Sequence, residues 1–478
     1  MKGLEILENE SELTLTCEHR VQSIAQKAHG VSHLHREMPP PRQALILAAG
    51  LGRSQKENGT CKPLMSLLGL TLIERVILTA KKAGISDFLI VIGHNGDEIR
   101  TQLTDGRKLG VKLDYVVNDE WKRGNGISIL KARDYFHNPF ILLMADHIFN
   151  HEILNELRKA TLLKGECILC VDGEMNKYLD LEEATKVIVT DGRIIDIGKK
   201  LIHYNGIDTG IFLCTPGIFY ALDESIANGN ESLSGAISIL ASKQKMKSLD
   251  VSDKYWIDVD DRKALKKAKS LLIEQLAKLT DGPIARVLNR PISLKISEML
   301  LKTRITPNQV TLLSFITGII ASVFFYLGDY IYLIIGGVLV QISSVVDGCD
   351  GEIARLKLRQ TNYGGWFDAV LDRYADGLII FGMIYGHWAL HGNALIWTVG
   401  FAALIGSFLN SYTSDKYDSI YRKILVYSNQ VRMGRDIRLF IIFVGALSNQ
   451  ILLTLAILAV ITNFESVRRI VVLRNECV

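Results

Sequence analysis

Charged residues are scarce in the last part of this sequence. Residues 305–478 hold 25 charged side chains in 174 positions, whereas the 304 positions before them hold 81, nearly twice the density. The average of 22% is close to that of an ordinary globular protein, which excludes a disordered or collagen-like chain. That average nevertheless combines two parts that differ in how they are solvated.

Cysteine is also sparse, and the net charge is small. Seven cysteines, an odd number spread along the chain, do not read as a secreted disulfide framework. Cys167 and Cys170 have C-x-x-C spacing without a second pair, so we expect a buried strand there rather than a metal site. The first residues, MKGLEILENESELT, are acidic where a signal peptide is apolar, so they give no indication of export. The net charge of +4 gives no indication of nucleic-acid binding.

Short apolar runs alternate with amphipathic stretches over residues 43–265. This alternation predicts an α/β domain with a mainly parallel, doubly wound, Rossmann-like sheet. Asp191-Gly192 is a two-residue turn signal that predicts a hairpin, and a helix is expected from about residue 261 to 279. We expect residues 266–304 to form a linker with helices next to the membrane, and residues 1–42 to be a polar segment whose role the sequence does not indicate. Strands are expected in the runs QALILAAG, FLIVIG, LDYVVN, PFILLMAD, ECILCVD, DTGIFLC and YWIDVD.

The uncharged stretches predict membrane helices. They are residues 305–328, 330–346, 377–414 and 439–464. About 20 residues cross a hydrocarbon core, so the third stretch must hold two spans, divided near His391-Gly392-Asn393. The fourth is either one helix or a hairpin that turns at Ser448-Asn449-Gln450. Only the hairpin places all the clusters of basic residues on the same side of the membrane. We therefore expect an all-α domain of six transmembrane helices over 305–478, in the cell membrane, with the α/β domain and the C-terminus in the cytoplasm.

Four aspartates lie at the expected cytoplasmic ends of the second and third of these helices: Asp347, Asp350, Asp368 and Asp372. Spacings of three and four residues place each pair on one face of its helix. Carboxylates in a membrane are unfavourable without cations, and an all-oxygen site suits Mg²⁺ together with substrate phosphates. An ion-pair cluster with Arg355 and Arg373 is the alternative. Gly351 and Gly364 remove side chains where a nucleotide would approach.

These residues spell D-x-x-D-G-x-x-A-R-x₈-G-x-x-x-D-x-x-x-D, which resembles the signature of the CDP-alcohol phosphotransferase family at every position. For eight fixed positions, a chance match at a given start is on the order of 10⁻¹⁰. The resemblance implies transfer of a phosphoalcohol from a CDP-alcohol to a hydroxyl, with release of CMP. In such an enzyme Asp372 is a shared metal ligand or the base that takes the acceptor's proton. The implied metal ligands are Asp347, Asp350 and Asp368, and the implied nucleotide contacts are Asn308, Gly351 and Arg355.

A second motif follows the first expected strand. ALILAAG runs into Gly50-Leu51-Gly52-Arg53, and Lys62-Pro63 comes nine positions after the arginine. Such a loop can wrap phosphates with backbone N–H groups while Arg and Lys neutralise their charge. It is not a dinucleotide fingerprint, because Gln55 replaces the third glycine, and it lacks the GK[ST] of a Walker loop. Taken alone, the G-x-G loop is equally consistent with a simple turn.

The wider pattern, L-A-A-G-x-G-x-R followed by K-P, resembles the nucleotidyltransferase family over residues 43–265, although the loop SQKENGTC lacks the proline common there. The resemblance implies Mg²⁺, with Mn²⁺ as an alternative, bound by Asp146 together with Asp258 or Asp260. A strand-end cap is the other reading of Asp146, but open α/β sheets place ligands where strands end. Arg53 and Lys62 are implied to be catalytic. The implied phosphate contacts are Gly50, Gly52, Arg53 and Lys62, and those near the base and ribose are Gly124, Asn125 and Ser128.

The two halves share one intermediate, a CDP-alcohol, which favours CTP as the nucleotide. Their combination resembles the family of bifunctional inositol-1-phosphate cytidylyltransferase / di-myo-inositol phosphate phosphate synthases, enzymes of osmolyte biosynthesis. The resemblance implies CTP, inositol-1-phosphate and CDP-inositol as partners, and a second inositol phosphate as acceptor. Two alternatives are a CDP-choline or CDP-ethanolamine enzyme fused to a lipid phosphotransferase, and a nucleotide-sensing scaffold that regulates the membrane domain.

Three arginines near the expected fifth helix are spaced by three residues: Arg432, Arg435 and Arg438. On one helix face they would suit the phosphate of a polar acceptor. Anchoring to anionic lipid is the alternative. Apolar helix faces outside the active site could support a homodimer through the membrane domain, although no motif singles out the surface.

Overall fold

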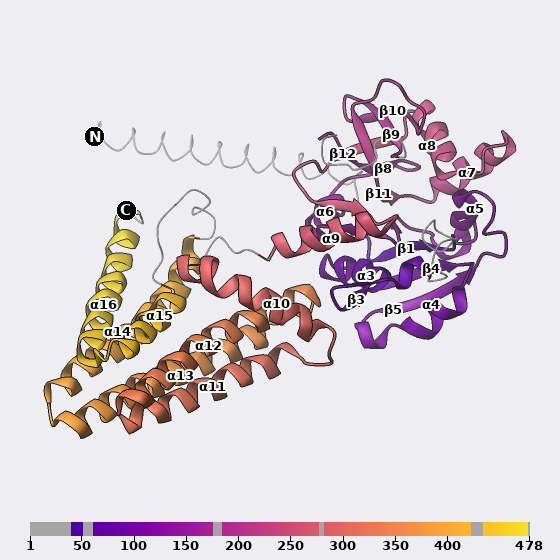
Figure 1. Ribbon diagram of the computed structural model, residues 1–478. Coiled ribbons are helices and arrows are strands. Elements are labelled where there is room, and N and C mark those ends of the chain that lie inside the picture. The colour runs from indigo at the N-terminus through magenta and orange to yellow at the C-terminus, as the bar shows by residue number, and fades with distance from the viewer. Residues whose placement is uncertain (1–39, 51–60, 175–183, 277–281, 422–433, 477–478) are drawn as a thin grey trace, which may run out of the picture. The chain divides into compact units, whose positions relative to one another are not determined.

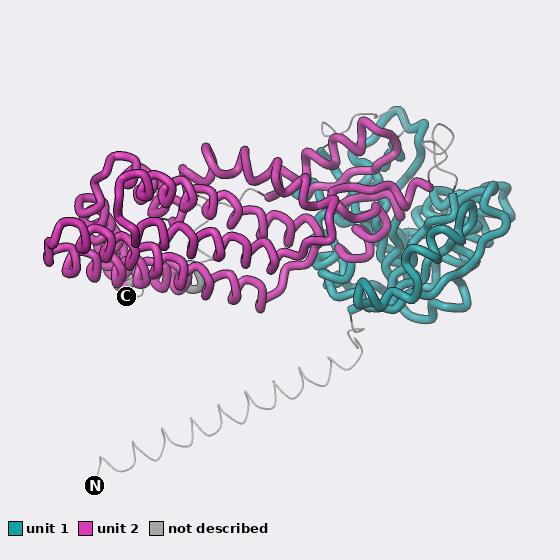
Figure 2. The backbone as a smooth tube through the Cα atoms, turned by 60° about the horizontal axis from the view of Figure 1, so that its bottom comes forward, with its two compact units in different colours: residues 1–50, 80–144, 150–254 teal, residues 51–79, 145–149, 255–478 magenta. Residues whose placement is uncertain are grey.

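The computed structural model describes residues 40–50, 61–174, 184–276, 282–421 and 434–476. The chain divides into two compact units, drawn in teal and magenta in Figure 2. Unit 1 comprises residues 1–50, 80–144 and 150–254, and unit 2 comprises residues 51–79, 145–149 and 255–478. The segments that contain Lys62 and Asp146 therefore belong to the same unit as the C-terminal helices.

Unit 1 is built on a nine-stranded mixed sheet (Figure 1). The prediction of a mainly parallel sheet is correct for the half in which β5, β4, β1 and β6 are parallel neighbours, whereas in the other half only β8 and β12 are parallel. β11 runs antiparallel to both β6 and β8, because a continuous apolar run shows burial but not strand direction. In sheet order the strands are β5 (Lys112–Val117), β4 (Asp87–Ile92), β1 (Gln43–Ala48), β6 (Phe140–Met144), β11 (Gly206–Cys214), β8 (Cys167–Asp172), β12 (Met246–Asp250), β10 (Arg193–Gly198) and β9 (Lys186–Thr190).

Local signals in the sequence placed these strands well. All the runs expected to be strands contain one, and the hairpin between β9 and β10 turns at Asp191-Gly192, both with positive φ. Cys167 and Cys170 are buried in β8, as predicted. The helices between and after the strands are α3 (Leu72–Lys82), α4 (Gly96–Leu103), α5 (Asn125–Leu130), α6 (His151–Leu157), α7 (Gly217–Ala227), α8 (Leu233–Ser242) and α9 (Arg262–Glu274).

The core of unit 1 includes a group of stacked aromatic rings. Phe140, at the start of β6, is fully buried and stacks on Phe136 at 4.0 Å and on Phe219 of α7 at 5.8 Å between ring centroids. Leucine, isoleucine and valine side chains of the sheet and of α7 and α8 surround these rings. Close packing of this kind makes the sheet of unit 1 rigid.

Two small sheets belong to unit 2. β2 (Ser66–Leu67) pairs with β3 (Leu70–Thr71), and β7 (His147–Phe149) pairs antiparallel with β13 (Trp256–Asp258). The second pairing sets His147 opposite Asp258, and Val259 N donates to Asp146 O at 3.2 Å. Chain segments far apart in the sequence therefore bring their carboxylates together.

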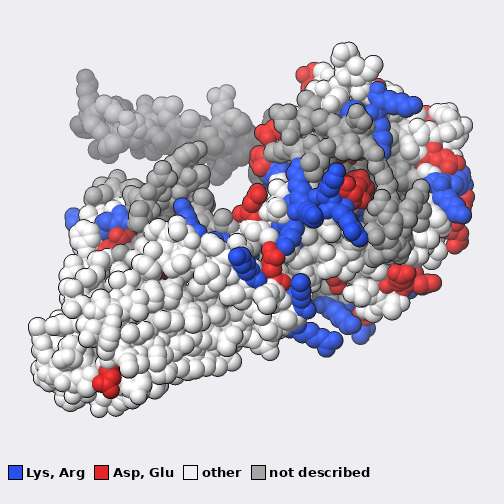
Figure 3. All heavy atoms as spheres, viewed as in Figure 1, with Lys and Arg blue, Asp and Glu red and all other residues white. Residues whose placement is uncertain are grey.

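The C-terminal part of unit 2 is helical, and on the face drawn in Figure 3 few charged side chains interrupt its surface. Among the described residues, four helices are long and apolar enough to cross a membrane: α11, α12, and the parts of α14 and α16 over Leu395–Tyr417 and Ile451–Val472. α13 carries aspartates in its first half, and α15 is 13 residues long. The helices are α11 (Pro307–Leu327), α12 (Tyr330–Leu356), α13 (Asn362–His391), α14 (Leu395–Tyr421), α15 (Arg435–Leu447) and α16 (Ile451–Glu476), preceded by a π-helical turn η6 (Ala285–Asn289) and α10 (Arg290–Leu301).

Local sequence signals mark the ends of these helices. Thr306 caps α11 in a capping box with Gln309, and Pro307 occupies the first turn, where its missing N–H is not needed. The long uncharged stretch breaks at Gly392, whose φ of 63° ends α13. The final stretch is a hairpin, as predicted, since α15 ends before Ser448 and α16 begins after Gln450. α11 packs on α12 and α13, and α14 packs on α16.

Candidate functional site

A cavity of about 360 Å³ lies within the helical part of unit 2. Three of the four predicted metal ligands line it, namely Asp347, Asp350 and Asp368. Carboxylate oxygens of Asp347, Asp368 and Asp372 lie within 4.8 Å of one another. α12 supplies the first two aspartates of the motif and α13 the last two, so the two helix faces predicted from the spacing do meet.

The carboxylate of Asp350 accepts two hydrogen bonds, whereas one carboxylate oxygen of Asp368 accepts none among the described residues. Thr311 Oγ1 donates to Asp350 Oδ2, and the backbone N–H of Gly351 donates to its Oδ1. Asp368 Oδ1 is buried and accepts no hydrogen bond among the described residues. A buried anionic oxygen without a donor is unfavourable unless a cation binds it. The donor set, all carboxylate oxygen, fits a hard divalent ion such as Mg²⁺.

Arg435, at the start of α15, reaches the aspartates directly. Its Nη1 lies 2.7 Å from Asp372 Oδ1 and 3.1 Å from Asp347 Oδ2. Its Nε donates to Asp376 Oδ1 at 3.0 Å, and Arg438 Nη2 lies 3.2 Å from Asp376 Oδ2. In this arrangement Arg435 supplies positive charge to two residues of the metal motif.

Arg438 is engaged inside the helical domain. Its Nη1 donates to Ser407 O at 2.6 Å and to Ser407 Oγ at 2.8 Å, and the residue is 4% exposed. The third residue of the predicted cluster, Arg432, lies outside the described residues. The structure therefore brings Arg435 to the cavity and packs Arg438 against α14.

The predicted nucleotide contacts of the membrane motif gather on the same cavity. Asn308, Gly351 and Arg355 all line it. A Cβ on Gly351 would lie 3.1 Å from Arg355 Nη1, and a Cβ on Gly364 would lie 3.4 Å from Asn308 Oδ1. The two glycines thus sit against the side chains predicted to contact the nucleotide.

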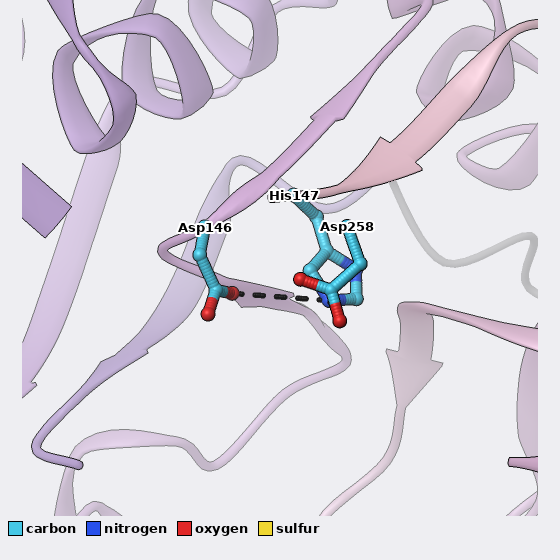
Figure 4. Close-up of side chains that lie close together, drawn as sticks. All are labelled: Asp146, His147 and Asp258. Atoms are coloured by element: carbon cyan, nitrogen blue, oxygen red, sulfur yellow. Dashed lines mark ion pairs between the residues drawn. The ribbon is translucent and has the colours of Figure 1, made fainter. Parts of the chain in front are cut away.

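A second acidic cluster lies where β7 pairs with β13 (Figure 4). The carboxylates of Asp146 and Asp258 and the ring of His147 lie close together, each offering a ligand atom within 4.8 Å of the others. His147 Nε2 is 3.5 Å from Asp258 Oδ2 and 3.8 Å from Asp146 Oδ1. Asp258 Oδ1 is buried and accepts no hydrogen bond among the described residues, which again fits a cation site.

Lys62 lies among these carboxylates. Its Nζ is 2.6 Å from Asp146 Oδ2, 2.7 Å from Asp260 Oδ1 and 3.8 Å from Asp258 Oδ1. Burial by itself would lower the pKa of Lys62, but the three carboxylates outweigh burial and raise it. Burial would raise the pKa of Asp146, but the positive charge of Lys62 and the electrostatic effect of the neighbouring His147 outweigh burial, so that pKa is lowered. Both groups are therefore ionised near neutral pH.

The remaining predicted contacts of this site belong to unit 1 or lie outside the described residues. Gly50 ends the described part of the loop after β1, and Gly52 and Arg53 fall outside it. Gly124 precedes α5 and Asn125 begins it, with Asn125 Oδ1 accepting a hydrogen bond from Leu233 N at 2.8 Å. Ser128 Oγ accepts a hydrogen bond from Asn118 Nδ2 at 2.9 Å.

Sequence reasoning missed two site residues. His147 directly follows Asp146, and its pairing opposite Asp258 depends on β13, which comes much later in the chain. Asp376 continues the four-residue spacing of Asp368 and Asp372, a signal that could have found it. Its partner Arg435 comes from another helix, and helical periodicity gives no information about that contact.

Two family models match the chain. The MobA-like NTP transferase domain matches residues 44–193, and CDP-alcohol phosphatidyltransferase matches residues 304–462. A protein of Rubrobacter xylanophilus called bifunctional IPC transferase and DIPP synthase is 35% identical over 90% of this chain and 96% of its own length. The protein of the same name from Archaeoglobus fulgidus is 35% identical over 86% of this chain and 79% of its own. The solved inositol-1-phosphate CTP transferase from T. maritima is 26% identical, covers 48% of this chain and 95% of its own, and has a TM-score of 0.44.

Proposed function

Because this chain belongs to the family of bifunctional IPC transferases and DIPP synthases, we propose that it catalyses two consecutive reactions. In the first, CTP and inositol-1-phosphate give CDP-inositol and pyrophosphate. In the second, the phosphoinositol group passes from CDP-inositol to a hydroxyl of a second inositol phosphate, giving di-myo-inositol phosphate phosphate and CMP. The observation that carries this proposal is that the described residues hold two separate acidic clusters, one around Asp146 and one around the aspartates of the D-x-x-D motif.

For the first reaction we assign the cluster around Lys62. Asp146, with Asp258 or Asp260, would bind a divalent ion, and His147 lies close enough to contribute. Lys62 holds positive charge where the triphosphate would lie and, with Arg53, would stabilise charge on the leaving pyrophosphate. The phosphates would also contact the loop of Gly50 and Gly52, and the base and ribose would contact Gly124, Asn125 and Ser128.

For the second reaction we assign the cavity of α12 and α13. Asp347, Asp350 and Asp368 would hold divalent ions, Mg²⁺ or Mn²⁺, which when bound neutralise the pyrophosphate of CDP-inositol. Asp372 would accept the proton of the attacking hydroxyl as the new phosphodiester forms and the bond to CMP breaks. The nucleotide would contact Asn308, Gly351 and Arg355.

The acceptor phosphate is assigned to the arginine cluster, with Arg435 as the member that reaches the aspartates. Arg→Ala variants of Arg432, Arg435 and Arg438 test this assignment. We expect a higher KM for the inositol phosphate acceptor in each variant whose arginine binds the acceptor phosphate. An unchanged acceptor KM in all three variants would refute it.

We also propose six membrane spans, with the α/β domain and the C-terminus in the cytoplasm. α13 and α15 would then cross the membrane in addition to the four helices named above, and lipid or a second copy of the chain would cover their exposed apolar side chains. The positive-inside distribution of Lys and Arg supports this orientation. Single-cysteine labelling near Gly392 and Asn449 tests it, since both loops should react from outside the cell.

The choice of alcohol is tested with the purified full-length protein, CTP and Mg²⁺. Either inositol-1-phosphate or phosphocholine is supplied, and pyrophosphate and CMP are measured separately. We expect pyrophosphate with inositol-1-phosphate. Pyrophosphate from phosphocholine alone would favour the CDP-choline alternative, and none from any alcohol phosphate would favour the scaffold.

A further inference from the structure

The segment before the first apolar helix forms part of the transferase cavity. Four of its residues line that cavity together with the aspartates of the motif: Ala285, Asn289, Arg290 and Ser293. The D-x-x-D motif begins at Asp347, so it assigns no role to any of them. The segment formed by η6 and α10, residues 285–301, therefore contributes to the cavity independently of the motif.

Hydrogen bonds hold this segment firmly against α12. Glu352, the residue after Gly351 in the motif, is buried and accepts hydrogen bonds from Ser293 Oγ and Ser297 Oγ, both at 2.7 Å. Asn289 Nδ2 donates to Ser344 Oγ at 3.0 Å. The side chains of Asn289, Ser293 and Ser297 thus tie this segment to the helix that carries Asp347 and Asp350.

The backbone of η6 is itself unusual. A π-helical turn is rare in proteins and occurs frequently at functional sites. Here it covers Ala285–Asn289, and Ala285 N donates to Asp436 Oδ2 at 2.9 Å. Asp436 follows Arg435, so the turn contacts the start of α15 as well as α12. It ends where Arg290 begins α10.

Arg290, the first residue of α10, is the cation that this segment contributes to the cavity. It is half-buried, and its Nη2 donates to Leu276 O at 2.8 Å, which fixes the direction of the side chain. Three other arginines line the same cavity, namely Arg355, Arg359 and Arg435. The planar guanidinium group matches phosphate oxygens with two parallel N–H donors.

We propose that Arg290 binds a phosphate group of a substrate of the second reaction, so that residues 285–301 are part of the active site and not only a linker. This inference rests on the proposed function, in which the cavity receives the pyrophosphate of CDP-inositol and the phosphate of the acceptor. Both sources present the same chemistry to Arg290, and the experiment distinguishes them.

The test measures CMP release by the full-length Arg290→Gln and Arg290→Ala variants, with CDP-inositol and inositol phosphate varied in turn. Gln preserves a donor for Leu276 O but removes the charge. We expect the KM of one substrate to rise by about tenfold or more, because a charge-assisted hydrogen bond is lost. A rise for CDP-inositol identifies the pyrophosphate as the ligand, and a rise for inositol phosphate identifies the acceptor. Arg290→Lys should recover part of the loss.

Arg286→Ala is the matched control. Arg286 lies on the same segment, is exposed and does not line the cavity, so both KM values should match those of the wild type. Pyrophosphate release from CTP and inositol-1-phosphate should be unchanged in every variant, which reports an intact fold. Unchanged KM values for both substrates in Arg290→Gln and Arg290→Ala would overturn the inference. A wild-type protein that releases no CMP would instead overturn the proposed function.

Discussion

Lys62 and Arg435 have similar surroundings in two different sites. Each is a cation set among three aspartates, at distances of 2.6–3.8 Å for Lys62 and 2.7–3.1 Å for Arg435. Several carboxylates close together repel one another, and a cation at short distance offsets that repulsion. Both residues therefore affect how strongly their sites attract a divalent ion. This effect is separate from any contact that they make with a substrate.

Lys62→Met should lower pyrophosphate release by about 100-fold or more, since charge stabilisation by one positioned group is commonly of that size. Its pH dependence should change as well. In the wild type the lowered pKa of Asp146 keeps it ionised, and the stability that this contributes is lost only as pH falls through that pKa. Without Lys62, burial raises the pKa of Asp146, so activity should fall at a higher pH on the acid side.

The measurement is the pH profile of pyrophosphate release across the acid and neutral range. Lys82→Met, which removes an exposed lysine from α3, is the control and should follow the wild-type profile. If the activity of Lys62→Met fell at the same acidic pH as that of the wild type, Lys62 would not set the ionisation of Asp146.

Arg435→Ala should increase the apparent affinity for Mg²⁺ in the second reaction while raising the acceptor KM. The guanidinium contacts Asp347 and Asp372, so it competes for predicted metal ligands. If its removal makes the binding free energy of Mg²⁺ more favourable by about 1.4 kcal/mol, the Mg²⁺ concentration for half-maximal CMP release falls by about tenfold. Arg373→Ala is the control, because Arg373 adjoins Asp372 in sequence but pairs with Asp415 at 3.0 Å. A higher Mg²⁺ requirement in Arg435→Ala would contradict the competition.

Among the elements, helix ends were predictable because their signals are local. Thr306-Pro307 opens α11, Gly392 follows the end of α13, and a turn at Asn449 separates α15 from α16. The direction of β11 was not predictable, because an apolar strand has the same composition whether its neighbours are parallel or antiparallel.

The acidic motifs were predictable as residues but not as complete sites. The i, i+3 and i, i+4 spacings placed the membrane aspartates on two helix faces, and the structure brings those faces together. The contacts of Arg435 with Asp347 and of His147 with Asp258 join segments that lie far apart in the sequence. Such contacts depend on tertiary packing, which neither the hydrophobic periodicity of the sequence nor the spacing of its motif residues indicates.

Phe140→Ala should destabilise unit 1 by about 3–5 kcal/mol, because it removes a fully buried ring from between two others and leaves a cavity. Tyr220→Ala is the matched control: Tyr220 follows Phe219 on α7 but is 75% exposed, so its loss should change stability by about 0.5 kcal/mol or less. Urea unfolding followed by tryptophan fluorescence and circular dichroism measures both. Equal midpoints for the two variants would show that the stacked rings contribute little.

At the scale of the whole molecule, the scarcity of charge after residue 304 and the two acidic clusters belong together. The helical part keeps charge mainly near the metal motif and at the ends of α14, α15 and α16, while the segments of Lys62 and Asp146 carry the second cluster within the same compact unit. One chain thereby holds a site proposed to make a CDP-alcohol and a site proposed to consume it. The two activities should be separable by single substitutions.

The most direct measurement is CMP release by the Asp146→Asn protein under two conditions. Supplied with CTP and inositol-1-phosphate, it should release neither pyrophosphate nor CMP. Supplied with CDP-inositol and inositol phosphate, it should release CMP at the wild-type rate, whereas Asp368→Asn should release pyrophosphate in the first condition and no CMP in either. If CDP-inositol failed to restore CMP release to Asp146→Asn, the claim of two separate sites that share one intermediate would be contradicted.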